Sequence, residues 1–302
     1  MHPRLRIFAM FAVMTLIFTA IGWLLGGYFL GGNWLFGSVF FLVLAGAMNF
    51  VSYFWAHKIV LWSYRAKVVT EAEQPRLYRL VQKAAQFSGL PMPKVAIVPM
   101  ATPNAFATGR NPKTAVVAAT EGILPLLNDK ELTGVLAHEM AHVKDRDILV
   151  MSVAATVAGA IAIMARMFTW NLMFGGQRRN SNGSDMLIAV AVLVTAPIAA
   201  LLVQLAISRS RETKADFVGA QNCGDPNALA DALEKLEYAN KRRPFQRGNP
   251  ASASLFIVNP FRGSTFFAMF ATHPPIQKRI QRLRAMAQEM RYGRPMPAIH
   301  PA

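Results

Sequence analysis

The sequence predicts an α+β, mostly helical integral membrane protein with about four transmembrane helices and a water-soluble part that holds a small antiparallel sheet. Three observations support this fold class. Long uncharged runs occur in two pairs, amphipathic helices and short strands occupy the remaining segments, and only 16% of the 302 residues are charged. A soluble domain usually carries about 25% charged residues. The hydrophobic content of 53% excludes a disordered chain and argues against one wholly soluble domain.

Residues 1–57 are predicted to form a transmembrane hairpin. The runs 7–30 and 34–56 contain no charged residue over 24 and 23 positions, and a helix needs about 20 apolar residues to cross the hydrocarbon core of a bilayer. Only residues 31–33 separate the two runs, so the connection between them must be tight. The first run is too long for a cleaved signal peptide and no clear cleavage site follows it, so we expect a retained anchor.

Residues 148–208 are predicted to form a second transmembrane hairpin, with spans at about 148–170 and 186–208. Pro197 in the second run is compatible with a membrane helix, where neighbouring helices satisfy the freed carbonyl. The alternative is a buried helical hairpin in a soluble domain, because Arg166 interrupts the first run and the hydrophobicity is modest.

The remaining segments, 58–147 and 209–302, have the patterns of a water-soluble domain. Apolar residues recur at helical spacing within 71–88, and Asn128 with Glu131 forms a capping pair that opens a further helix. The other expected elements are helices at about 225–240 and 275–290 and strands at 94–99, 104–108 and 113–120.

The basic residues fall almost entirely on one side of the predicted membrane. Of the 32 lysines and arginines, which face only 16 acidic residues, 29 lie in the N-terminal tail or in the segments 57–147 and 209–302. The predicted outer loops, 31–33 and 171–185, contain only two. Loops rich in lysine and arginine stay on the cytoplasmic side. The sequence therefore predicts that the water-soluble domain faces the cytoplasm.

A metal-binding motif lies in the helix that opens at Asn128. His138 and His142 are four residues apart, which places both imidazoles on one helix face, where they can hold one zinc ion. Glu139 lies about 100° around the helix from His138, beside the metal, where it can take a proton from water. The alternative is two surface histidines on an ordinary helix. Because the chain has a single cysteine, a cysteine-rich zinc module is excluded.

A catalytic zinc needs a third protein ligand, and the sequence offers two candidates. Glu212 is favoured over His273 because Asp216 follows it by four residues, so that one carboxylate can bind zinc and the second can contact a ligand histidine. The second predicted hairpin also returns the chain to the side of the zinc helix. The alternative is a solvated helix face. Asp145 and Asp147 are expected to balance the charges of their basic sequence neighbours.

Four motifs are spread over nearly the whole chain. In chain order they are Asn104-Ala105-Phe106-Ala107-Thr108-Gly109, His138-Glu139-Met140-Ala141-His142 with Asp147, Arg211-Glu212 with Ala215-Asp216, and Thr272-His273-Pro274-Pro275. With this combination the chain resembles the HtpX family of bacterial membrane zinc endopeptidases, which is related to the CAAX prenyl proteases.

The resemblance implies a cytoplasmic zincin domain with a gluzincin-type fold, built from the segments 58–147 and 209–302, with one Zn²⁺ per chain. It implies Glu212 as the third metal ligand and Glu139 as the general base. It also implies that His273 lies near the scissile carbonyl, where the alternative is a histidine that merely precedes a helix. The family's substrate-binding edge strand corresponds to Asn104, Ala105, Phe106 and Ala107. Without the resemblance, a plain turn and strand is the simpler interpretation of that segment.

Taken together, these features predict a stress-related, multi-pass zinc endopeptidase of the bacterial cell inner membrane that cleaves misfolded or damaged membrane proteins at the cytoplasmic face. Its partners are then the lipid bilayer and unfolded substrates. One alternative is a CAAX-type processing protease, although four spans are too few for a large membrane-enclosed chamber. The other is a non-enzymatic basic membrane adaptor that binds nucleic acid through residues 241–247 and 278–284. No recognition motif surrounds those clusters, so no nucleic-acid partner is expected.

Overall fold

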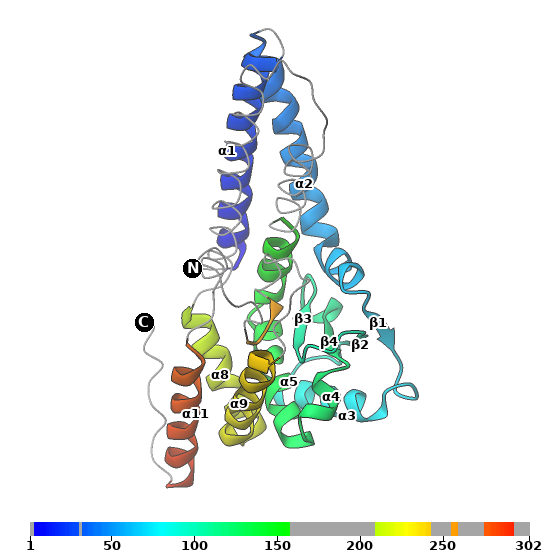
Figure 1. Cartoon of the computed structure of the whole chain (residues 1–302), viewed down its shortest axis with the longest axis vertical. Helices are drawn as coiled ribbons and strands as arrows, with labels where there is room; N and C mark the ends of the chain where they lie inside the picture. Colours follow the sequence, from blue (N-terminus) through cyan, green and yellow to red (C-terminus); the bar gives the residue numbers. More distant parts are fainter. Residues whose placement is uncertain (1–2, 30–31, 158–208, 243–254, 259–274, 293–302) are drawn as a thin grey trace.

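The chain forms an apolar helical hairpin that stands on a body of helices and a small sheet (Figure 1). The computed structural model describes residues 3–29, 32–157, 209–242, 255–258 and 275–292. Within these ranges the chain is mostly helical and contains one four-stranded sheet. The predicted spans 148–170 and 186–208 lie largely outside the described residues.

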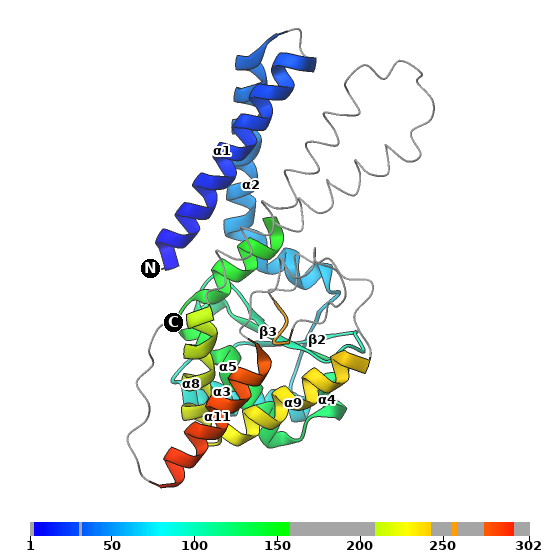
Figure 2. The same cartoon turned by 60° about the vertical axis from the view of Figure 1, so that its left-hand side comes forward.

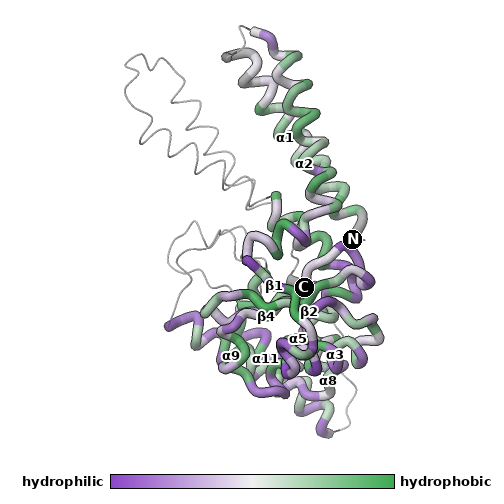
Figure 3. Tube along the Cα trace, turned by 90° about the vertical axis from the view of Figure 1, so that its right-hand side faces the viewer, coloured by the Kyte–Doolittle hydropathy of each residue, from purple (hydrophilic) through white to green (hydrophobic). Residues whose placement is uncertain are grey.

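The hairpin consists of helices α1 (Pro3–Phe29) and α2 (Trp34–Ser63), which lie side by side (Figures 1 and 2). Asn33 caps α2, because its side-chain oxygen accepts a hydrogen bond from the backbone N–H of Phe36 at 3.1 Å. Both helices are apolar along most of their length (Figure 3). Among the described helices, α2 is the one long and apolar enough to cross a membrane, and the apolar part of α1, Ile7–Trp23, is shorter.

Glycines allow α1 and α2 to touch backbone to backbone. Gly22 and Gly26 are four residues apart on α1 and both face Gly37 of α2, where an added Cβ would lie 2.7 Å from the Cα of Gly26. Small residues at this spacing are typical of helix pairs that pack in membranes. Farther along the pair, the Asn49 side-chain amide donates a hydrogen bond to Thr15 Oγ1 at 3.0 Å. The hairpin is therefore held by close packing and by a polar contact.

Replacing Gly37 with Leu is expected to separate the two helices of the hairpin. The added side chain would overlap the backbone of α1, and overpacking of this kind costs about 1–3 kcal/mol. We therefore expect the melting temperature of the detergent-solubilised protein to fall by several degrees. Gly46→Leu on the same helix is the matched control, because nothing lies within 4 Å of a Cβ at Gly46. Equal melting temperatures for the two variants would contradict this packing.

The sheet is mixed, whereas the sequence predicts an antiparallel one. Its strands lie in the order β1-β2-β4-β3. β2 pairs with β4 in parallel, and the two outer pairs are antiparallel. The antiparallel prediction is wrong because β4 inserts between β2 and β3. Both β2 and β4 are apolar on both faces, as is typical of central strands that helices cover on each side. The strands are β1 (Lys67–Val69), β2 (Lys94–Val98), β3 (Ala105–Thr108) and β4 (Val116–Thr120).

Apolar clusters cover both faces of the sheet. The first cluster joins one face to α3 (Pro75–Ser88), α5 (Asp129–Lys144), α9 (Pro226–Arg242) and α11 (Ile276–Arg291). The second joins the other face to the start of α1, the end of α2 and the helix Asp147–Val157. Helix α8 (Arg209–Cys223) packs on α5. The remaining short elements are the 3₁₀ helix Pro112–Thr114 and α4 (Ile123–Leu126). The hairpin therefore contacts the sheet from the side opposite α5.

Local sequence signals determine where the helices begin and end. α3 begins at Pro75, inside the predicted range 71–88, because proline suits the first helical turn. It ends at Ser88 and is capped by Gly89, whose positive φ of 64° is typical of a C-terminal cap. α5 begins with the capping box that the sequence predicts, in which Asn128 and Glu131 bond reciprocally to each other's backbone N–H groups at 3.0 Å.

Candidate metal centre

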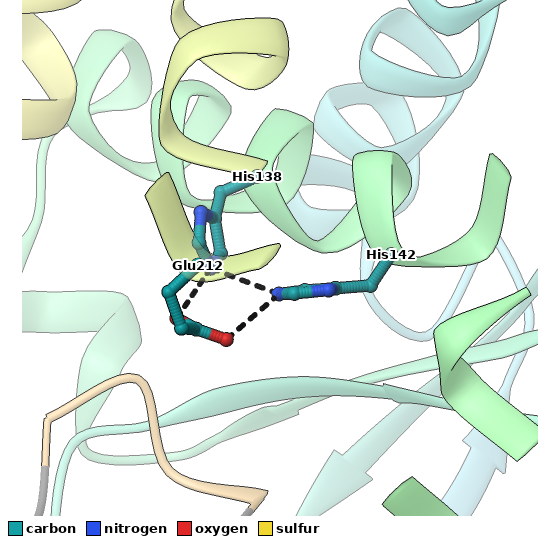
Figure 4. Close-up of side chains that lie close together, drawn as sticks. All are labelled: His138, His142 and Glu212. Atoms are coloured by element: carbon teal, nitrogen blue, oxygen red, sulfur yellow. Dashed lines mark hydrogen bonds and ion pairs between the residues drawn. The ribbon is translucent and has the colours of Figure 1, made fainter. Parts of the chain in front are cut away.

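Helix α5 presents two histidines to the same buried space. His138 and His142 are 1% and 3% exposed, and their Nε2 atoms lie 3.3 Å apart. The planes of the rings meet at 87° (Figure 4). The helical spacing of four residues brings the two nitrogens together, as the motif predicts. The surface-histidine alternative is wrong because both side chains are buried.

Glu212 of α8 reaches the same space from a second helix. Its carboxylate lies 3.3 Å from His142 Nε2 and 3.7 Å from His138 Nε2, as Figure 4 shows. One donor atom from each of the three residues lies within 4.8 Å of the others. Two imidazoles and a carboxylate are the donors of many catalytic zinc sites. The donor set and its convergence therefore fit a divalent metal ion, and His138, His142 and Glu212 are the residues that could hold it.

A glycine allows α8 to come close enough for this convergence. A Cβ at Gly219 would lie 2.7 Å from the backbone N of His138 and 2.8 Å from its Cα. The two helices thus meet backbone to backbone beside the histidine. Any larger residue at this position must push α8, and Glu212 with it, away from α5.

Glu139 points from α5 toward the sheet. Its Oε2 accepts a hydrogen bond from the backbone N–H of Ala107 in β3 at 2.9 Å. The side chain is buried, and burial raises the pKa of the Glu139 carboxyl above its ordinary value. The carboxylate therefore lies between the histidine pair and the sheet, held by a backbone group.

Three of the predicted edge-strand residues, Ala105, Phe106 and Ala107, lie on β3, which is the last strand in the sheet order. Asn104, just before β3, is buried, and its side chain bonds to the backbone of the segment 255–258. Its Nδ2 donates to the carbonyl oxygen of Leu255 at 3.0 Å, and its Oδ1 accepts from the N–H of Ile257 at 3.1 Å. Asn104 thus holds a distant part of the chain beside the strand. His273 lies outside the described residues.

Asp216 and Arg279 form a buried pair behind His138. Asp216 Oδ1 lies 3.0 Å from His138 Nδ1, and Arg279 donates two hydrogen bonds to the same carboxylate at 2.7 and 2.8 Å. Burial alone would raise the pKa of Asp216, but the charge and hydrogen bonds of Arg279 outweigh it and lower that pKa to about 2. Arg279 is missing from the sequence prediction. The signal that could have found it is a charged residue among Ile276, Ile280 and Leu283, the apolar positions of α11.

The aspartates after α5 pair with α8. Asp145 Oδ2 lies 2.6 Å from Lys214 Nζ, and Asp147 forms an ion pair with Arg211. Asp147 Oδ2 also lies 3.7 Å from His142 Nδ1. The expectation that these aspartates balance their sequence neighbours is therefore wrong, because α8 brings its own basic residues to them.

Comparisons with known proteins identify related sequences. A family model described as Peptidase family M48 matches residues 71–287. The protein "Protease HtpX homolog" of Thermococcus sibiricus is 51% identical over 95% of this chain and 97% of its own length. The homolog from Desulforapulum autotrophicum is 48% identical over 94% of this chain and 90% of its own length. The crystal structure of S. mikatae Ste24p matches with a TM-score of 0.46 and 15% identity over 90% of this chain and 62% of that chain.

The family model and the two relatives exclude the non-enzymatic adaptor and agree with the predicted family. The family model covers most of the chain, including α5, α8 and most of α11, and the two relatives are matched over at least 90% of their own length. Together with the apolar helix α2, the relatives support a membrane protein. The chain belongs to peptidase family M48 and is a metalloendopeptidase.

Proposed function

We propose that this metalloendopeptidase uses zinc, is anchored in the cell membrane by its hairpins, and cleaves unfolded or misfolded membrane proteins at the cytoplasmic face. The observation that carries the proposal is the convergence of His138, His142 and Glu212, with Glu139 between them and an edge strand. Two histidines and one carboxylate would hold zinc with three protein ligands, which is the number typical of catalytic zinc sites. This donor set favours zinc over calcium or magnesium, which take oxygen ligands.

We propose that Glu139 carries the proton in the reaction. Zinc held by the three ligands supplies Lewis acidity toward a peptide carbonyl and makes a nearby water more acidic. Glu139 takes a proton from the attacking water and passes it to the leaving amine. The hydrogen bond from the Ala107 N–H fixes one carboxylate oxygen, and the other oxygen would carry the proton.

We propose that substrate binds along β3 as an added strand. β3 pairs with β4 in an antiparallel ladder, in which successive residues direct their backbone groups alternately toward and away from the partner strand. Ala107 gives its N–H to Glu139, so Ala107 and its alternate neighbour Ala105 direct their backbone groups away from β4. Since Glu139 takes the Ala107 N–H, an extended peptide can bond to the backbone of Ala105 and to the carbonyl oxygen of Ala107, whatever its side chains are. This suits a protease for unfolded chains.

We propose that the segments 58–147 and 209–302 form one protease domain on the cytoplasmic side, and that 1–57 and 148–208 form its membrane hairpins. Support for the single domain comes from α5 and α8, which belong to different segments and contribute to one metal cluster. Support for the orientation comes from the basic residues, of which 29 of 32 lie in these segments or in the N-terminal tail. Substrate from the bilayer could then reach the site laterally, past the helix Asp147–Val157.

The proposal is tested by metal content and by metal-dependent digestion. The full-length protein purified in detergent is expected to hold one zinc per chain, and His142→Ala is expected to hold none, because two remaining ligands bind zinc weakly. A chelator should stop digestion of an unfolded membrane protein in liposomes, and added zinc should restore it. Arg284→Ala, a change on α11 away from the histidines, should retain both zinc and activity. Digestion by a zinc-free protein would overturn the proposal.

A further inference from the structure

We propose that both metal-ligand histidines are positioned by matching His–Asp–Arg relays, in which an aspartate holds the imidazole and an arginine holds the aspartate. This rests on the proposed function, in which the histidines bind the metal through Nε2. The two relays are His138–Asp216–Arg279 and His142–Asp147–Arg211.

The first relay is built from direct contacts among buried groups. Asp216 Oδ1 lies 3.0 Å from His138 Nδ1. The Arg279 guanidinium donates from Nη2 to Oδ1 at 2.7 Å and from Nε to Oδ2 at 2.8 Å. Such two-pronged pairing fixes the plane of a carboxylate as well as its position. Arg279 is only 1% exposed, so water does not compete for its contacts.

The second relay has the same order but a looser contact. Asp147 Oδ2 lies 3.7 Å from His142 Nδ1, beyond hydrogen-bond range, and Arg211 forms an ion pair with Asp147. The chain makes a special turn to bring Asp147 there. Arg146 has a φ of 59°, a left-handed conformation that costs energy for any residue except glycine. This turn ends α5 and returns the buried Asp147 to the histidine.

The relays explain how each imidazole keeps the Nε2 lone pair available for a metal ion. An imidazole that directs its Nδ1–H toward a carboxylate leaves the lone pair of Nε2 for a metal ion. Asp216 does this for His138 at 3.0 Å, whereas Asp147, at 3.7 Å from His142 Nδ1, favours the same tautomer of His142 through its charge. In this structure the two Nε2 atoms face each other at 3.3 Å, and both face Glu212. A rotated ring would lose that arrangement. The carboxylates set the orientation of the rings, and the arginines stop the carboxylates from turning.

The charges of the centre balance when both arginines are counted. Its buried carboxylates would leave a large uncompensated negative charge, which is costly away from water. A divalent metal ion would neutralise half of that charge, and two guanidinium groups neutralise the rest. The carboxylates are Glu139, Asp147, Glu212 and Asp216, and the guanidinium groups are Arg211 and Arg279.

The first relay should matter more than the second. Arg279 comes from α11 and also donates to the carbonyl oxygen of Ile257 at 2.9 Å, so two further parts of the chain fix its position. The Arg211 side chain is partly exposed. We therefore expect a larger loss of metal affinity when Arg279 is replaced than when Arg211 is replaced.

The test measures zinc affinity by competition with a chelator, using the full-length protein in detergent. Arg279→Gln and Asp216→Asn are expected to weaken zinc binding by about 10–100-fold, and Asp147→Asn and Arg211→Gln by less. The absorption spectrum of cobalt-substituted protein should change in the same order, because it reports ligand geometry. Arg279→Lys keeps the positive charge but cannot donate the paired hydrogen bonds of a guanidinium group, so it should restore zinc affinity only in part. Arg284→Ala is the matched control, since Arg284 lies on the same helix as Arg279 and its loss removes an exposed ion pair with Asp231 of α9.

The outcomes separate this proposal from the proposed function. A wild-type protein that holds no zinc would contradict the proposed function itself. A wild-type protein with zinc, together with an Arg279→Gln variant whose affinity stays within twofold and whose melting temperature falls as in Arg284→Ala, would overturn the relays alone. If Arg279→Gln does not fold, Arg211→Gln still decides the question, because its partly exposed side chain tolerates replacement. Unchanged affinity and cobalt spectrum in that variant would reject the second relay.

Discussion

Replacing Glu139 with Gln is expected to reduce proteolysis by about a hundredfold to ten-thousandfold while zinc stays bound. Glutamine has the size of glutamate, and its carbonyl oxygen can still accept the hydrogen bond from the Ala107 N–H. It cannot take a proton from water or return one to the leaving amine. The structure around the metal is thus preserved while the proton carrier is lost. The measurement is the initial rate of digestion of an unfolded protein by detergent-purified enzyme, with zinc content determined on the same sample.

Glu131→Gln is the matched control for this variant. Glu131 is a second buried glutamate of α5, but it belongs to the capping box and pairs with Lys235 at 2.8 Å. Its replacement should lower the melting temperature and leave the rate per folded, zinc-loaded molecule nearly unchanged. A Glu139→Gln enzyme that retained a tenth of the wild-type rate would contradict the role of Glu139 as the general base.

Signals that act over a few residues made much of the fold predictable. The capping box of Asn128 and Glu131, Pro226 and Pro275 each begin a helix where the sequence indicates one. The closeness of His138 and His142 was also predictable, since helical spacing alone brings the two side chains together. Sheet order is different, because it depends on which strands pair across long separations. The apolar composition of β2 and β4 indicates central strands, but it does not determine which strand lies beside which, and the predicted antiparallel sheet was wrong for that reason.

The rest of the site depends on contacts between helices that spacing does not determine. Glu212 lies 70 or more residues beyond the histidines, so sequence spacing does not select it as the third metal ligand. The aspartate four residues later and the family resemblance favour it over His273. The burial of Arg279 could not be predicted, because a charged residue on an amphipathic helix is normally assigned to the solvated face of that helix. Asp147 reaches His142 through the left-handed turn at Arg146, and no sequence pattern of arginine predicts that conformation.

The backbone contact between α8 and α5 offers a way to disturb the metal site without touching a ligand. Replacing Gly219 with Val is expected to lower the stability by about 3 kcal/mol and to weaken zinc binding at least tenfold. The Cβ alone would lie 2.7 Å from the backbone N of His138, and backbone cannot move aside as a flexible side chain can. The helix must shift instead, and Glu212 shifts with it away from the histidine pair. Thermal unfolding and chelator competition measure the two effects.

Gly134→Val separates the loss of stability from the loss of metal. Gly134 lies on α5 and packs on α9, where a Cβ would lie 3.0 Å from the backbone N of Leu229. Valine there should lower the melting temperature, but α8 keeps its place, so zinc affinity should stay close to that of the wild type. If both variants lost zinc in proportion to their loss of stability, metal binding would follow general folding and not the spacing between α5 and α8. If Gly219→Val alone loses zinc, the approach of the two helices determines whether the third ligand can reach the metal.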